Sequence, residues 1–267
     1  GMNLGLGLPG HFPGEFAIKT GTYLSWFEKI ASLGVNALRL YTVHPPGFYE
    51  ALARFNESGA RLYLFQGIWT ELPEGNDFRD GRFMAGFWAD IRNAVDAVYG
   101  NVALPERPGY AQGAYAYDVS PYLAGFIIGR EWESCAVKDF NTRHKRKQAE
   151  YLGAFLNLRA GNPFEIWMTE ICDGLQRYEF ERYGVTHPVS TINWPTLDPL
   201  DHPSESPVEE ERLRQGMGPL RRGVCIDGHD EESLDLSTIT VRAGNGFFAS
   251  YHVYPYYPDF MIYGYPD

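Results

Sequence analysis

Hydrophobic and polar residues follow two different periods along the first half of the chain. Short apolar runs that suit buried strands are each followed by a longer segment with helical spacing, at intervals of about 25 residues. The expected strands cover residues 3–8, 35–41, 60–66 and 123–128, and the expected helices cover residues 22–33, 46–58 and 80–99. Strands that alternate with helices in this way predict an α/β fold with a parallel sheet.

Two long helices are expected next, at residues 140–159 and 163–183. Asn162 is a suitable N-cap for the second of them, and Pro163 suits its first position.

The last part of the chain contains two more expected strands. The fifth covers residues 187–194, and the sixth, with its exit loop, covers residues 246–258. Between them, residues 195–245 form an excursion that is rich in Pro, Asp, Glu and Gly, with one short helix near residues 208–215. We interpret residues 1–267 as one domain with this excursion on the side of the active site.

The amino-acid composition limits the kind of protein this can be and the partners it can bind. The net charge of −11 and the pI near 5.1 argue against a nucleic-acid partner, because phosphate binding requires clustered Lys and Arg. The hydrophobic fraction of 44% is typical of a soluble globular domain. The sequence shows neither the roughly 18 apolar residues of a membrane helix nor a leader at its amino end, which favours a cytoplasmic location.

Three cysteines occur, at positions 135, 172 and 225, and their spacing is not that of metal ligands. We expect them to be buried or free thiols. No metal and no other cofactor is predicted.

Residues that could act in catalysis or binding follow the fourth expected strand. The apolar run at residues 123–128 ends in Gly129, Arg130, Glu131, Trp132 and Glu133. Charged residues at the carboxyl end of a buried parallel strand usually face a cleft, so this segment is a candidate site. The alternative is a salt bridge in a loop beside a tryptophan of the core.

Three segments resemble, in chain order, motifs of the glycoside hydrolase (β/α)8 superfamily, closest to its family 2 and family 5 catalytic barrels. Residues 34–46 resemble the second-strand signature, in which Asn-x-x-Arg is followed by His-Pro. Gly129-Arg130-Glu131 resembles the fourth-strand Gly-Asn-Glu, and residues 251–255 resemble the sixth-strand His-x-Tyr. The resemblance implies a (β/α)8 TIM barrel that acts on a β-linked carbohydrate by a retaining mechanism.

The resemblance also implies roles for individual residues. Glu131 matches the general acid/base, although a structural carboxylate is the alternative. Arg39 matches the arginine that holds the nucleophile, or forms an interior salt bridge with Glu131. His44 matches a histidine on the substrate side, or is a turn histidine before two prolines.

Further residues are expected around the substrate. His252 and Tyr254 alternate along the sixth strand and so share a face, which the resemblance directs into the pocket; a buried polar pair is the alternative. The tryptophans and the asparagine at strand ends suit sugar stacking or packing, and they are Trp69, Trp132, Asn193 and Trp194. Arg130 replaces the asparagine of the family pattern, and its charge would hold an adjacent Glu131 ionised.

The nucleophile of the retaining mechanism has no match. The family places a glutamate on the seventh strand, and no glutamate follows Glu232. We therefore expect an incomplete barrel whose nucleophile lies beyond the residues given. A non-catalytic carbohydrate-binding or scaffold barrel is the alternative, and a metal-dependent hydrolase is a third option.

Overall fold

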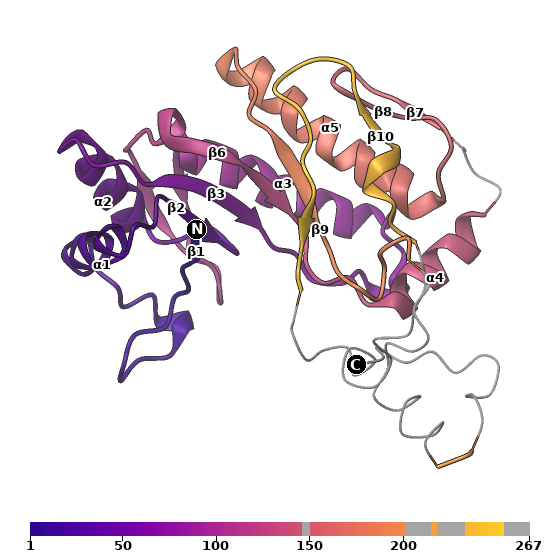
Figure 1. Ribbon diagram of the computed structural model, residues 1–267, viewed down its shortest axis with the longest axis horizontal. Helices are drawn as coiled ribbons and strands as arrows, with labels where there is room; N and C mark the ends of the chain where they lie inside the picture. Colours follow the sequence, from indigo (N-terminus) through magenta and orange to yellow (C-terminus); the bar gives the residue numbers. More distant parts are fainter. Residues whose placement is uncertain (146–149, 201–214, 218–232, 254–267) are drawn as a thin grey trace, which may run out of the picture. The chain divides into compact units, whose positions relative to one another are not determined.

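The computed structural model describes residues 1–145, 150–200, 215–217 and 233–253. Its largest sheet is parallel and has six strands in the order β1-β2-β3-β6-β9-β11, which are labelled in Figure 1. The strands are β1 (Met2–Asn3), β2 (Ala37–Leu40), β3 (Tyr63–Ile68), β6 (Leu123–Ile128), β9 (Val189–Asn193) and β11 (Ser250–Tyr251). They correspond in order to the six expected strands, so the predicted α/β class is confirmed.

β6 has the expected bounds, whereas the other five strands differ from theirs, and β1 and β3 show this clearly. β1 is confined to two residues, whereas residues 3–8 were expected to be extended. β3 begins three residues later than expected and continues through Gly67. A Cβ atom at Gly67 would collide with the backbone of Leu40 and Tyr41, so the glycine allows β3 to lie close to the end of β2.

The contacts of the chain divide into two compact units. Unit 1 comprises residues 1–69, 85–128 and 178–189, and unit 2 comprises residues 70–84, 129–177 and 190–267 as far as these are described. Among the described helices, none is long and apolar enough to cross a membrane.

Unit 1 has an aromatic core between two helices that both end at glycines. These helices are α1 (Thr20–Ser32) and α2 (Pro46–Glu57), and they lie side by side in Figure 1. The glycines that follow them, Gly34 and Gly59, have positive φ, the conformation that commonly ends an α-helix. α3 (Gly81–Val98) was also expected, whereas the hairpin of β4 (Val102–Leu104) and β5 (Gly113–Tyr115) was not.

Unit 2 contains an expected helix that is wrong. Residues 140–159 contain the end of α4 (Ser134–His144) and the strands β7 (Tyr151–Leu152) and β8 (Leu156–Leu158). These two strands form a small antiparallel sheet with β10 (Ile239–Val241). The buried carboxylate of Asp173 accepts hydrogen bonds from the backbone N–H groups of Phe155 and Leu156. These tertiary partners replace the helical hydrogen bonds that the spacing predicted.

The second long helix has the bounds that the sequence predicted. This helix is α5 (Pro163–Tyr183). The Asn162 side chain accepts hydrogen bonds from the N–H groups of Phe164 and Glu165. The Glu165 carboxylate accepts from the Asn162 N–H in return, which completes a capping box.

Short 3-10 turns connect these elements. They are η1 (Pro13–Glu15), η2 (Glu74–Asn76), η3 (Ser120–Tyr122) and η4 (Leu236–Thr238). Most of the expected short helix near residues 208–215 lies outside the described residues.

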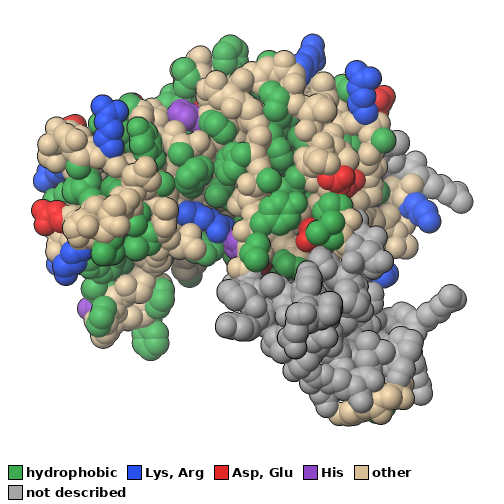
Figure 2. Space-filling model, viewed as in Figure 1, with side chains coloured by type: hydrophobic (Ala, Val, Ile, Leu, Met, Phe, Trp, Pro, Cys, Tyr) green, Lys and Arg blue, Asp and Glu red, His purple; other side chains and the backbone are tan. Residues whose placement is uncertain are grey.

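Hydrophobic side chains reach the surface at many places on the face drawn in Figure 2, with charged side chains scattered among them. In unit 2 the exposed large hydrophobic residues include Val241, Tyr251 and Val253. Apolar surface of this extent is normal for a folded protein, so exposure alone does not mark a binding site.

His44 is part of the buried core of unit 1. His44 is 1% exposed, its Nδ1 atom lies 3.2 Å from the Tyr23 hydroxyl, and its ring packs edge-on against Phe48. Its backbone carbonyl accepts a hydrogen bond from the Tyr115 hydroxyl. Burial lowers the pKa of His44 from 6.5 to about 3, so the imidazole is neutral in the folded protein at pH 7.

We expect His44 to make the protein less stable in acid. Between pH 6.5 and 3 the unfolded chain binds a proton at His44 and the folded chain does not, so stability is lost as the pH falls below 6.5. At pH 5 the loss from this residue is about 2 kcal/mol. Urea unfolding at pH 7 and pH 5 should show a decrease that is smaller by this amount in His44→Asn than in the parent chain. Equal decreases in the two proteins would contradict the expectation.

Candidate active site at the end of β6

The chain leaves β6 through a turn that requires glycine. Gly129 has a φ of +94°, and a Cβ atom there would lie 2.5 Å from Cζ2 of the Trp132 ring. A side chain at this position would strain the backbone and collide with the indole. The glycine of the motif Gly129-Arg130-Glu131 therefore has a structural cause, which is close packing against Trp132.

Trp132 itself is fully buried in an aromatic cluster of unit 2. Its ring centroid lies 5.4 Å from that of Phe78, 5.8 Å from that of Phe164 and 5.6 Å from that of Trp167. Its backbone carbonyl accepts a hydrogen bond of 3.0 Å from Nε1 of Trp194. Both the side chain and the backbone of Trp132 are thus fixed, and with them the segment that follows β6.

Glu131 meets His252 in this unit. Oε1 of Glu131 lies 2.6 Å from Nδ1 of His252. The His252 N–H donates to the carbonyl oxygen of Asn193 at 2.8 Å, which holds the end of β11 beside the end of β9. The His252 side chain is 8% exposed and the Glu131 side chain is 32% exposed, so the carboxyl group reaches solvent while the imidazole is covered.

A carboxyl and an imidazole at this distance can share one proton. Either the imidazole Nδ1–H donates to the carboxylate, or a protonated carboxyl group donates to a neutral Nδ1. The two forms differ only in the position of the proton. A carboxyl group that is open to solvent on one side and linked to such a partner on the other can act as a general acid or a general base.

Arg130 forms ion pairs with two carboxylates. Its Nη2 atom lies 2.6 Å from Oε1 of Glu133, and its Nη1 atom lies 3.2 Å from Oε2 of Glu71. The pairing with Glu133 is the kind of loop salt bridge that the sequence offered as the alternative for this segment. Glu71 was missed, because it lies in the loop after β3 and no motif connects it to residue 130.

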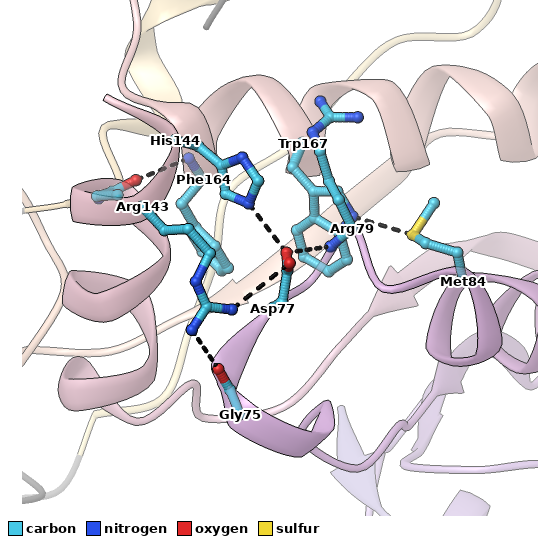
Figure 3. Close-up of polar contacts among 9 residues, drawn as sticks. Gly75, Asp77, Arg79, Met84, Arg143, His144, Phe164 and Trp167 are labelled. Carbon is cyan, nitrogen blue, oxygen red and sulfur yellow. Dashed lines mark hydrogen bonds and ion pairs between the residues drawn. The ribbon is translucent and has the colours of Figure 1, made fainter. Parts of the chain in front are cut away.

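The loop that carries Glu71 is held to α4 by a polar cluster in unit 2. Asp77 accepts hydrogen bonds from Nε2 of His144 at 2.9 Å and from the Arg79 N–H at 3.1 Å. Figure 3 shows His144 and Arg143 both pointing from α4 toward Asp77, and Arg143 also donates to the carbonyl of Gly75. Burial raises the pKa of Asp77, but the hydrogen bonds from His144 and the Arg79 N–H outweigh it, so the net shift is downward.

The side chains of Asn193 and Trp194 are also buried and hydrogen-bonded. The Asn193 amide donates to the carbonyl of Leu234 at 2.8 Å and accepts from the Trp194 N–H at 2.9 Å. In this conformation Trp132, Asn193 and Trp194 support the ends of β6 and β9 by packing. Their direct contact with a sugar stays a prediction.

The remaining expected site residues do not belong to the described part of unit 2. Arg39 and His44 belong to unit 1, where the Arg39 guanidinium carbon lies 4.5 Å from the ring centroid of Tyr41. His44 is buried in the core described above, so its contact with a substrate is untested. Tyr254 lies outside the described residues.

Among the described residues, no cluster of three or more His, Cys, Asp or Glu side chains is arranged to hold a metal ion. Cys172 is a buried free thiol, as expected, and burial raises its pKa. Cys135, on the first turn of α4, is disulfide-bonded, so the expectation of a thiol at that position is wrong. A bonded sulfur adds a covalent restraint to the helix that follows the candidate site.

Comparison of the chain with models of protein families, with curated proteins and with solved structures gives no match. The candidate site therefore rests on its own geometry, which is the contact of Glu131 with His252 beside the ion pairs of Arg130.

Replacing Gly129 by alanine should destabilise the protein by about 3 kcal/mol, because the substitution adds backbone strain and a collision with Trp132. Gly86→Ala is the matched control, since Gly86 lies in α3 with open space around its Cα. That control should be neutral or more stable by about 0.5 to 1 kcal/mol. Urea unfolding followed by tryptophan fluorescence measures both. Equal stabilities of the two variants would show that Gly129 is not required.

Proposed function

We propose that this chain is a glycoside hydrolase-like (β/α)8 barrel that acts on a β-linked carbohydrate, with Glu131 as its general acid and base. The observation that supports the proposal is the 2.6 Å contact between Glu131 and His252. These residues come from two separate motifs of the resemblance, and a functional relation between the motifs requires that they meet. The six-stranded parallel sheet is consistent with part of such a barrel.

In the proposed mechanism, Glu131 acts in both steps of a double displacement. It first donates its proton to the leaving glycosidic oxygen while a second carboxylate attacks the anomeric carbon. It then takes a proton from the water that releases the sugar. His252 supports this cycle, because it can hold the shared proton when the carboxyl group is ionised.

The surroundings of Arg130 favour this role for Glu131. A guanidinium beside a lone carboxylate would keep it ionised and lower its strength as an acid. Glu133 and Glu71 both pair with Arg130 and offset its positive charge. The position at which the family has asparagine is thus occupied by a residue whose charge is locally compensated, and it remains a candidate contact for the substrate.

The second candidate function is a non-catalytic carbohydrate-binding or scaffold barrel. It is favoured by one observation: the group that lies 2.6 Å from Glu131 is the imidazole of His252 and not a second carboxylate that could act as the nucleophile. A protein of this kind would use the same residues to bind a sugar and would not break a bond.

Replacing Glu131 by glutamine tests the catalytic role. We expect the full-length chain with Glu131→Gln to lose about 10²-fold or more in kcat/KM on nitrophenyl β-glycosides, because the leaving oxygen then lacks a proton donor. On dinitrophenyl β-glycosides, whose leaving group needs little protonation, the rate of the first step should fall much less. Stopped-flow release of the phenol on a panel of β-linked sugars measures both.

Glu74→Gln is the matched control, because Glu74 is an exposed glutamate of η2 in the same unit. It should keep the parent activity. Activity of Glu131→Gln within tenfold of the parent on both kinds of substrate would exclude Glu131 as the acid/base. Sugar binding in calorimetry, without turnover of any substrate by the parent chain, would support the non-catalytic function.

A further inference from the structure

Unit 1 contains a pocket that the proposed function does not use. It has a volume of about 90 Å³ and lies beside the ends of β2 and β3, between α3 and the segment around the β4-β5 hairpin. Its lining includes Val43, Ile68, Ala94, Leu104 and Pro105 on the apolar side. Pockets beside the carboxyl ends of parallel strands are common ligand sites in α/β proteins.

The polar part of the pocket offers both an acceptor and donors. Oδ1 of Asp90 is paired with Nη1 of Arg107 at 2.6 Å, and the Arg107 guanidinium stacks 3.4 Å from the centroid of the Tyr110 ring. The Asp90 side chain is only 16% exposed, and burial raises its pKa although Arg107 lowers it. Within the described part of the chain, Oδ2 of Asp90 and the side-chain amide of Asn93 make no hydrogen bond, so both can serve a ligand.

The size of the pocket limits the group that enters it. A cavity of about 150 Å³ holds the six heavy atoms of benzene, so 90 Å³ suits about four. An acetamido group has four heavy atoms. Its methyl group matches the apolar wall, its N–H matches the carboxylate of Asp90, and its carbonyl matches the amide of Asn93.

Two aromatic rings indicate what this group is attached to. Trp69 and Tyr110 both line the pocket, and Tyr110 is held in place by Arg107. A pyranose ring presents flat apolar faces that pack on aromatic side chains, whereas the alkyl chain of an acetylated lysine presents none. The aromatic lining therefore favours an N-acetylated sugar over an N-acetylated peptide.

We propose that this pocket of unit 1 binds the acetamido group of an N-acetylhexosamine. The site is built from Asp90, Asn93 and Arg107 with the rings of Trp69 and Tyr110, and it is separate from the residues assigned to catalysis. The proposal does not depend on Glu131, because a chain that cannot hydrolyse a glycoside would still bind the sugar here.

The test is a titration of the full chain with three small ligands, followed by calorimetry and by NMR of the ligand acetyl group. Methyl N-acetyl-glucosaminide should bind with a Kd of roughly 1 mM, as expected for a ligand of this size. Methyl glucoside, which lacks the acetamido group, should bind at least tenfold more weakly. N-acetyl-lysine methylamide should bind weakly as well.

Two variants locate the binding. Asn93→Ala removes a hydrogen bond to the ligand and should weaken binding about tenfold, and Leu104→Phe fills the pocket and should abolish it. Asn36→Ala, at an exposed asparagine of unit 1 outside the pocket, is the control and should bind like the parent. Unfolding curves of the variants show whether each is folded, and Glu131→Gln should bind with unchanged affinity.

Equal affinities for the glucoside and the N-acetyl-glucosaminide would overturn the proposal. So would unchanged binding in both Asn93→Ala and Leu104→Phe, or tight binding of the lysine derivative without binding of the sugar. None of these outcomes bears on the hydrolysis test, because that test measures turnover in Glu131→Gln.

Discussion

The burial of Trp132 is the constraint on which the candidate site depends. Its indole has no exposed surface, and removing such a side chain from a core typically costs 3 to 5 kcal/mol. The backbone at Gly129 lies against one edge of this ring, and the Trp132 carbonyl is bonded to Trp194. Residues 130 and 131 are therefore held in a short arc between two fixed points. Hydrophobic packing in this way places two charged side chains at the end of a strand.

Neighbouring charges in the sequence need not be partners in the structure. Arg130 and Glu131 are adjacent, yet Arg130 pairs with Glu133 and Glu71, and Glu131 pairs with His252. The two carboxylates around the guanidinium offset its positive charge. The contacts of Asp77 with α4 hold the loop that supplies one of these carboxylates. A mobile Glu71 at the surface would offset the charge of Arg130 less effectively.

Local signals in the sequence were sufficient for some elements and misleading for others. α5 was predicted to the residue, because Asn162 and Pro163 mark its start and the capping box with Glu165 confirms the local preference. The expected helix at residues 140–159 failed because Asp173, far along the chain, takes the hydrogen bonds of Phe155 and Leu156. Periodicity reports which face of a segment is apolar. It does not report a distant partner for the backbone.

The candidate site also contains residues that a local motif identifies and residues that only the tertiary structure brings together. Glu131 and His252 lie in recognisable motifs, so their proximity was predictable from a resemblance. Glu71 and the pocket residues Asp90, Asn93 and Arg107 lie in no motif, because they come together only when α3 packs beside the β4-β5 hairpin. That hairpin was itself unexpected, since it is short and its pairing is antiparallel, whereas the expected sheet is parallel. The pocket is therefore found from its volume and the chemistry of its lining, and a specificity that it confers would not be encoded in the motifs of the resemblance.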